Sequence, residues 1–99
     1  AIGVDSNQNY LHPGTMLTSM LKRVDVAAYN VFKGAMDGTW KSGIQVLGLK
    51  EGGIDWALDE HNKHLITPAM KAAVEQAKTD IIAGKITVHD YMSDNKCPK

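Results

Sequence analysis

Two stretches of the chain carry apolar residues at the three- and four-residue spacing of an amphipathic helix. The first runs from Val24 to Asp37, with Asp25 in the first turn and Gly38 where a glycine often ends a helix. The pattern predicts a helix over residues 24–37, and it places Phe32 in the core because that ring lies on the apolar stripe. The stripe consists of Val24, Ala27, Ala28, Val31, Phe32 and Ala35.

The second helical stretch begins at Thr67-Pro68. The threonine hydroxyl can cap free backbone N–H groups, and proline suits the first helical position because it has no N–H to leave unpaired. Apolar residues then recur on one face until Gly84, where we expect the helix to end. That face consists of Met70, Ala73, Val74, Ala77, Ile81 and Ile82.

Short apolar segments bounded by turn residues predict the strands. The first segment, Ile2 to Val4, has the β-branched residues of a buried strand and ends at Asp5. Further candidates are residues 15–21, 42–49 and 86–88, with 54–58 as a short strand or edge segment. The order of strands and helices indicates an α/β fold with a largely parallel sheet, followed by a loose tail over residues 93–99.

The first two predicted strands both end in charged residues. Asp5 follows the first strand directly, and Lys22 and Arg23 follow the second. In open α/β sheets, ligands bind outside the carboxyl ends of the strands, so Asp5 and Lys22 could face one cleft. The alternative is that Asp5 and Ser6 only cap a turn.

Two polar loops are weaker candidates for sites. Gly52-Gly53 permits positive φ and a close backbone approach to a ligand, although a plain turn is favoured. The cluster from Asp59 to His64 contains two histidines three residues apart and a nearby carboxylate, a pattern that could bind a metal. Lys63 between the imidazoles would repel a cation, so a solvated loop is favoured.

Composition limits the remaining function classes. A chain of 99 residues that is 43% hydrophobic and 22% charged is ordinary for one soluble globular domain. Basic and acidic side chains both number 11, so no overall field attracts nucleic acid or an anionic membrane. The single cysteine, Cys97, gives neither a disulfide framework nor a thiol-based zinc site. Because an apolar strand stands at the very start, we expect sequence to be missing upstream and the chain to be a fragment.

Motifs of catalysis are not found in the sequence. It contains no Gly-rich phosphate loop, GxSxG elbow, HExxH pattern or paired catalytic carboxylates. This lowers the hypothesis that the chain is an enzyme.

Four segments together resemble the carboxy-terminal part of the basic membrane protein (BMP) family, the substrate-binding lipoproteins of ABC transporters. The segments are Gly3–Gln8, Leu17–Ala27, Gly48–Gly53 and Asp59–Lys63. The resemblance implies a type I periplasmic-binding-protein fold, in which two Rossmann-like lobes enclose the ligand. In that fold residues 1–23 would supply strands near the cleft and the lobe crossing, residues 24–92 α/β segments, and residues 93–99 a tail.

The same resemblance implies a set of ligand-binding residues: Asp5, Lys22 and Ser6. Asp5 would accept hydrogen bonds from the two ribose hydroxyls of a nucleoside, and Lys22 would donate to the ribose or the base. Asn7 stands where many relatives carry aspartate. The resemblance implies neither a cofactor nor a metal.

The leading hypothesis is therefore the substrate-binding component of an ABC importer, with a purine nucleoside as the favoured ligand. The alternatives are a nucleoside- or sugar-processing enzyme with Asp5 as acid or base, and a ligand-sensing regulatory domain. The partners expected are a nucleoside-like small molecule, the ABC permease, and the remainder of the receptor or a second copy of the chain, but not nucleic acid. The protein would be exported, periplasmic or at the cell surface, and lipid-anchored in its full-length form.

Overall fold

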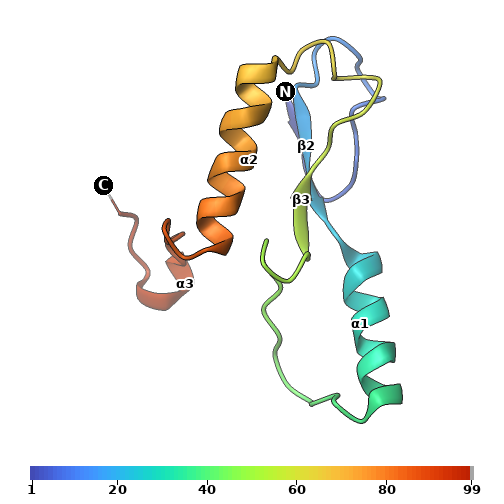
Figure 1. The fold of residues 1–99 in the computed structure, drawn as a ribbon, viewed down its shortest axis with the longest axis vertical. Coiled ribbons are helices and arrows are strands. Elements are labelled where there is room, and N and C mark those ends of the chain that lie inside the picture. The colour runs from blue at the N-terminus through green and yellow to red at the C-terminus, as the bar shows by residue number, and fades with distance from the viewer. Residues whose placement is uncertain (99) are drawn as a thin grey trace.

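A three-stranded sheet with the order β1-β2-β3 lies at the centre of the computed structural model, which describes residues 1–98 (Figure 1). The strands are β1 (Ile2–Gly3), β2 (Thr18–Lys22) and β3 (Ile54–Trp56). β1 pairs with β2 in parallel, whereas β3 runs antiparallel to β2. The fold is a small mixed α/β arrangement, and the prediction of a largely parallel sheet is wrong for β3.

Gly3 allows β1 to lie close against β2. It pairs with Ser19, and a Cβ atom at Gly3 would lie 2.5 Å from the Ser19 hydroxyl oxygen and 2.9 Å from Oε1 of Gln8. Any side chain larger than hydrogen would therefore displace two groups. The strand itself is confirmed, but its burial is not, because the side chain of Ile2 is exposed.

The helix α1 (Val24–Asp37) has the predicted bounds. Gly38 takes the left-handed conformation with a φ of 74° and donates its N–H to the Gly34 carbonyl, which ends the helix. At the start, Arg23 makes no capping bond, and its guanidinium instead donates to both oxygens of Asp25 at 3.0 and 2.9 Å. The ends of α1 are thus set by residues within one turn of each terminus.

The apolar stripe of α1 is uncovered. No residue of the helix is buried, and Phe32 is 73% exposed, so its predicted place in the core is wrong. The helix extends away from the sheet beyond the end of β2, and within residues 1–98 no other helix or strand packs on it (Figure 1).

The helix α2 (Pro68–Ile82) begins as predicted, because the Thr67 hydroxyl accepts a hydrogen bond from the Met70 N–H at 3.2 Å. Beyond its end, Gly84 has a φ of 80° and donates its N–H to the Ile81 carbonyl. Over residues 1–98, no helix combines the length and the apolar character needed to cross a membrane.

Two polar contacts link α2 to β3. Lys78 forms a 3.0 Å ion pair with Asp55, and the Trp56 indole N–H donates to Glu75 at 3.2 Å. Burial works to raise the pKa of Asp55, but hydrogen bonds from the Trp56 backbone and Lys78, together with the Lys78 charge, lower it overall. Asp55 therefore remains ionised and paired at neutral pH.

Two predicted strands do not form. Residues 42–49 and 86–88 lie outside the sheet, and the side chain of Ile44 is 98% exposed. Both segments have apolar, strand-like sequences, but no neighbouring strand pairs with either one in the described chain. A strand needs such a partner for its backbone groups, so sequence pattern alone was insufficient here.

The predicted tail is partly helical. A short helix, α3 (Tyr91–Asp94), is capped at its start by Asp90, whose carboxylate accepts a hydrogen bond from the Met92 N–H at 2.9 Å. The prediction of a loose tail is wrong for the first residues of the 93–99 range, and Lys99 lies outside the described residues.

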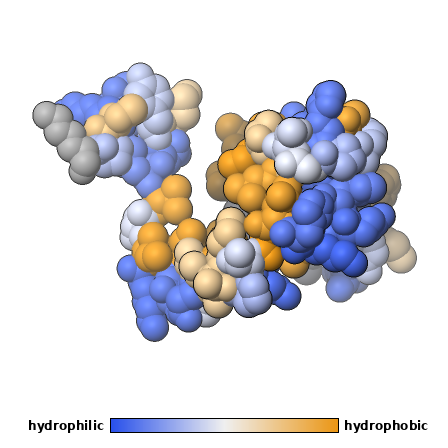
Figure 2. Space-filling model, turned by 90° about the horizontal axis from the view of Figure 1, so that it is seen from above, coloured by the Kyte–Doolittle hydropathy of each residue, from blue (hydrophilic) through white to orange (hydrophobic). Residues whose placement is uncertain are grey.

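The interior of the protein is polar. Among residues 1–98, the fully buried side chains are those of Asn9, Ser19 and Asn62, whereas the buried apolar residues are Met16 and Ala57. Many large apolar side chains lie on the surface instead, and Figure 2 shows orange residues gathered on the side of the larger mass that faces the narrower part of the molecule. Hydrogen bonds of buried side chains therefore help to hold the loops and strands of this fold together.

Removing one buried amide should show how much the fold depends on it. Asn62→Ala removes the side-chain partner of the Leu17 carbonyl and of the Asp59 N–H, while the Ala57 carbonyl keeps the Thr18 hydroxyl as a donor. The free energy of unfolding should fall by about 2–4 kcal/mol. Urea unfolding followed by circular dichroism measures this change. Asn30→Ala on exposed α1 is the control and should change stability by about 0.5 kcal/mol or less. Equal losses in the two variants would contradict a structural role for Asn62.

The start of α1 has a pH-dependent contact. The hydrogen bond from Arg23 lowers the pKa of Asp25 from 3.8 to about 2. Since the folded-state pKa is the lower one, the contact stabilises the folded chain above about pH 4 and is lost as the pH falls toward 2. A titration of the carboxyl resonance by NMR should show this value, and Arg23→Gln should move it back toward 3.8. An unchanged pKa in that variant would show that the guanidinium has no effect.

Candidate functional site

The parallel pairing of β1 and β2 brings Asp5 and Lys22 together. Both residues lie at the carboxyl ends of their strands, and the Lys22 ammonium is 3.2 Å from the Asp5 carboxylate. The Lys22 backbone N–H also donates to the Asp5 carbonyl at 2.8 Å. The two side chains are therefore neighbours in the structure, while the cleft that they were expected to face stays a prediction.

The Asp5–Lys22 ion pair is open to solvent. The two side chains are 63% and 62% exposed, so water screens their attraction and the pair adds little to stability. Both groups nevertheless keep free hydrogen-bonding capacity: the carboxylate can accept further bonds and the ammonium can donate them. The pair can therefore contact a polar ligand without losing buried structure.

Asp5 occupies a strained backbone conformation. Its φ is 74°, a value that residues other than glycine seldom adopt, and the Ser6 N–H donates to the Val4 carbonyl at 3.0 Å. A hydrogen bond between residues two apart with positive φ at the central residue is the pattern of the rarer, strained form of the γ-turn. Strain of this kind often marks a functional site.

Ser6 is held through its backbone. Its N–H closes the turn around Asp5, while among the described residues its hydroxyl makes no hydrogen bond. The predicted turn at Asp5 and Ser6 therefore exists, and it coexists with an exposed Asp5 carboxylate.

Behind this turn lies a cluster of side chains that we call the asparagine network: Asn7, Asn9, Ser19, Asp59 and Asn62. Asn7 donates from Nδ2 to an oxygen of Asp59 at 2.6 Å, and Asn9 donates to the same oxygen at 3.4 Å. Ser19 donates to Asn9 at 2.8 Å and accepts from the Gln8 backbone N–H at 3.0 Å. The network joins the loop that follows β1 to strand β2 and to the loop that follows β3.

Asn62 fixes the other side of the network. Its Nδ2 donates to the carbonyls of Leu17 and Ala57, both at 2.9 Å, and its Oδ1 accepts from the Asp59 N–H at 2.8 Å. Each of its polar atoms therefore has a partner, as a buried amide requires.

The favoured prediction of a solvated loop over residues 59–64 is wrong for Asn62, which is fully buried. The burial of Asn62 could not be predicted from the local sequence, because its partner Leu17 lies 45 residues away.

Asp59 is an ionised member of the network. The hydrogen bond from Asn7 is the largest influence on its pKa, and together with bonds from the His61 N–H and from Asn9 it outweighs burial, so the pKa is lowered. Within residues 1–98, no three histidine, cysteine or acidic side chains come together as a metal site. The carboxylate thus serves as a hydrogen-bond acceptor in the structure.

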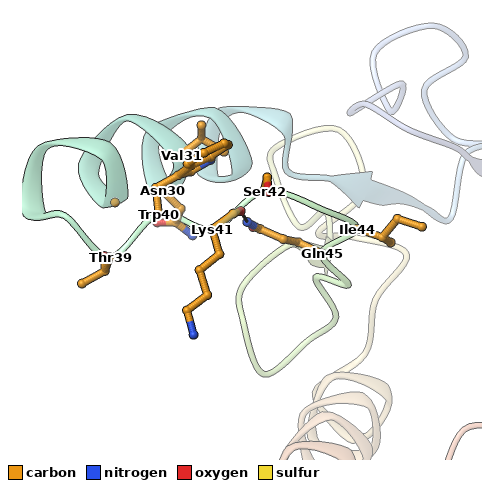
Figure 3. A pocket seen from close by; sticks show the side chains of 9 residues that line it. Asn30, Val31, Thr39, Trp40, Lys41, Ser42, Ile44 and Gln45 are labelled. Atoms are coloured by element: carbon orange, nitrogen blue, oxygen red, sulfur yellow. Dashed lines mark hydrogen bonds between the residues drawn. The ribbon is translucent and has the colours of Figure 1, made fainter.

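Two grooves lie elsewhere on the molecule. The larger, of about 450 Å³, lies between α1 and the segment that follows it, where Asn30 and Val31 of the helix neighbour Trp40 and the Lys41 side chain points away (Figure 3). A groove of about 260 Å³ lies between β3 and α2 and is lined mainly by apolar side chains. Neither groove contains Asp5 or Lys22. The residues predicted to bind the ligand therefore lie at the sheet edge, outside both grooves.

Comparison with known proteins identifies relatives over most of the chain. A family model described as Bmp, ABC transporter substrate-binding protein PnrA-like, matches residues 1–91. An ABC transporter nucleoside-binding protein, BmpA, of Lactococcus lactis is 38% identical over 97 residues, which is 88% of this chain and 26% of that protein. An uncharacterized lipoprotein of Pyrococcus abyssi is 50% identical over 60 residues, which is 60% of this chain and 15% of that protein.

A solved structure shares the fold. It is a solute-binding protein of an ABC transporter system from Aeropyrum pernix, with a TM-score of 0.62 and 28% identity over 91% of this chain. The match covers 33% of that structure. The chain thus spans about a third or less of the length of the proteins it matches.

The strain at Asp5 can be measured by substitution. A left-handed conformation costs a residue with a Cβ atom about 1 kcal/mol more than it costs glycine, so Asp5→Gly should be more stable than Asp5→Ala by about that amount. Both variants lack the carboxylate, and their comparison therefore isolates the backbone effect. Urea midpoints measure the difference, and a more stable alanine variant would show that Asp5 is not strained in solution.

Proposed function

Because this chain belongs to the Bmp family of PnrA-like ABC transporter substrate-binding proteins, we propose that it supplies part of a nucleoside-binding site, with purine nucleosides favoured. The proposed ligand-binding residues are Asp5, Lys22 and Ser6. The nucleoside class is supported by the name of the Lactococcus relative, a nucleoside-binding protein.

The exposed pair of Asp5 and Lys22 is the observation that carries this proposal. A carboxylate can accept hydrogen bonds from two neighbouring hydroxyls, and such charge-assisted bonds are stronger than neutral ones. The ribose of a nucleoside presents two adjacent hydroxyls of this kind. Lys22, 3.2 Å from the carboxylate, would donate to a ribose or base oxygen.

Ser6 would contribute a shorter-range contact. Its N–H is used in the turn around Asp5, so only its hydroxyl is available to a ligand. This group can both donate and accept a hydrogen bond, which suits a ribose hydroxyl beside the one that Asp5 binds.

We propose that the protein acts by binding and delivery rather than by chemistry. The ligand would pass to the permease of an ABC importer, and the protein would be exported and held at the membrane by a lipid anchor, as the name of the Pyrococcus lipoprotein suggests. The uncovered apolar stripe of α1 would contact the remainder of the receptor or a second copy of the chain. The much greater length of the relatives supports the first of these partners.

Titration with adenosine and 2′,3′-dideoxyadenosine tests the site. We expect adenosine to give saturable NMR shifts at the Asp5, Ser6 and Lys22 amides, with weak affinity in a chain this short. Asp5→Asn keeps a residue that tolerates positive φ but removes the charge, so binding should weaken by about tenfold or more. The dideoxy ligand should bind the parent as weakly as adenosine binds the variant.

Asp37→Asn provides the matched control, because it makes the same change at an exposed position on α1 and should leave the titration unaltered. If Asp5→Asn binds adenosine as tightly as the parent does, Asp5 is only a turn residue and the site assignment fails.

A further inference from the structure

We propose that Asn7 and Asp59 are positioning residues that hold Asp5 in its exposed, strained turn. The part of this inference that concerns ligand affinity rests on the proposed function, whereas the part that concerns the turn rests on geometry alone. The two residues are 52 positions apart in sequence, and their 2.6 Å hydrogen bond joins the loop that carries Asp5 to the loop after β3.

The turn at Asp5 needs support from its surroundings. A residue with a side chain keeps a φ of 74° only where neighbouring contacts outweigh the strain. The Asp5 carbonyl accepts the Lys22 N–H at 2.8 Å. Before Asp5 in the chain, the Val4 N–H donates to Oε1 of Gln8 at 3.1 Å. After Asp5, Asn7 is the first residue whose side chain bonds to another part of the protein.

The chemical role of each partner is fixed by a second contact. Oδ1 of Asn7 accepts the Asn9 N–H at 3.0 Å, which leaves Nδ2 as the group that faces Asp59. The second oxygen of Asp59 accepts the His61 N–H at 2.9 Å. Position 7 must therefore donate, and position 59 must accept.

This assignment makes an exchange of the two side chains informative. Asn7→Asp would place two carboxylates against each other, and Asp59→Asn would place two N–H donors against each other. With both changes together, one donor again faces one acceptor, now with the charge on residue 7. The exchanged pair also removes the 3.4 Å acceptor of the buried Asn9 Nδ2, so it should not regain the full stability of the parent.

Amide hydrogen exchange reports the position of Asp5 directly, because the Lys22 N–H is bonded to its carbonyl. The Ala57 N–H, which donates to Ser19 within the sheet at 2.9 Å, serves as the internal reference for general loss of stability. Each single variant should speed exchange at Lys22 by about tenfold relative to Ala57, and the exchanged double variant should restore most of the protection. The affinity for adenosine should likewise fall in each single variant and recover in the exchanged double variant.

Two further variants guard against trivial explanations. Asn7→Ser replaces the Nδ2 donor by a shorter hydroxyl without adding charge, so that the bond to Asp59 is lost or lengthened. This variant should speed exchange at Lys22 as Asn7→Asp does, and it replaces Asn7→Asp in the test if that variant does not fold. Thr67→Ala removes the cap of α2, so it lowers stability but should leave the ratio of exchange at Lys22 and Ala57 unchanged.

The inference is overturned if the exchanged variant is as impaired as the worse single variant, or if Asn7→Ser leaves exchange at Lys22 and adenosine binding as in the parent. If the parent binds no adenosine, the proposed function fails, while the exchange measurement still decides whether Asn7 and Asp59 position the turn.

Discussion

The hydrogen bonds of three buried polar side chains, Asn9, Ser19 and Asn62, are the constraint on which the arrangement of strands and loops depends. An unpaired buried amide costs far more free energy than a paired one gains, so only a conformation that satisfies every polar atom is stable. Within residues 1–98, no buried side-chain nitrogen or oxygen lacks a partner. The network therefore selects one loop geometry, whereas a small apolar core would tolerate several.

A single loop geometry matters at the sheet edge, because Asp5 is held there in an unfavourable backbone conformation with a φ of 74°. The carboxylate is exposed beside Lys22, while the backbone beneath it is tied to β2 and to the network. Such a division suits a binding site: the rigid part is buried and satisfied, and the part that meets a ligand keeps its hydrogen-bonding capacity. In the proposed receptor, the strain at Asp5 is the cost of presenting a carboxylate at a fixed position.

The sequence was informative where the determinants are local. Both long helices were predicted because Thr67, Gly38 and the apolar spacing act within a few residues, and the meeting of Asp5 and Lys22 followed from parallel strand ends. It failed where a distant partner decides the outcome. Residues 42–49 have a strand pattern but no strand beside them, and the loop that contains Asn62 was predicted to be solvated although this residue is buried and contacts Leu17.

Native-state hydrogen exchange, ranked over all amides, tests most directly whether the polar network is the most stable part of the protein. We expect the slowest exchange at the Asp59 and Gln8 amides, which donate to the side chains of Asn62 and Ser19, and faster exchange throughout the uncovered helix α1. If instead the amides in the middle of α1 are the most protected and those of the network exchange early, the network follows the fold rather than determining it.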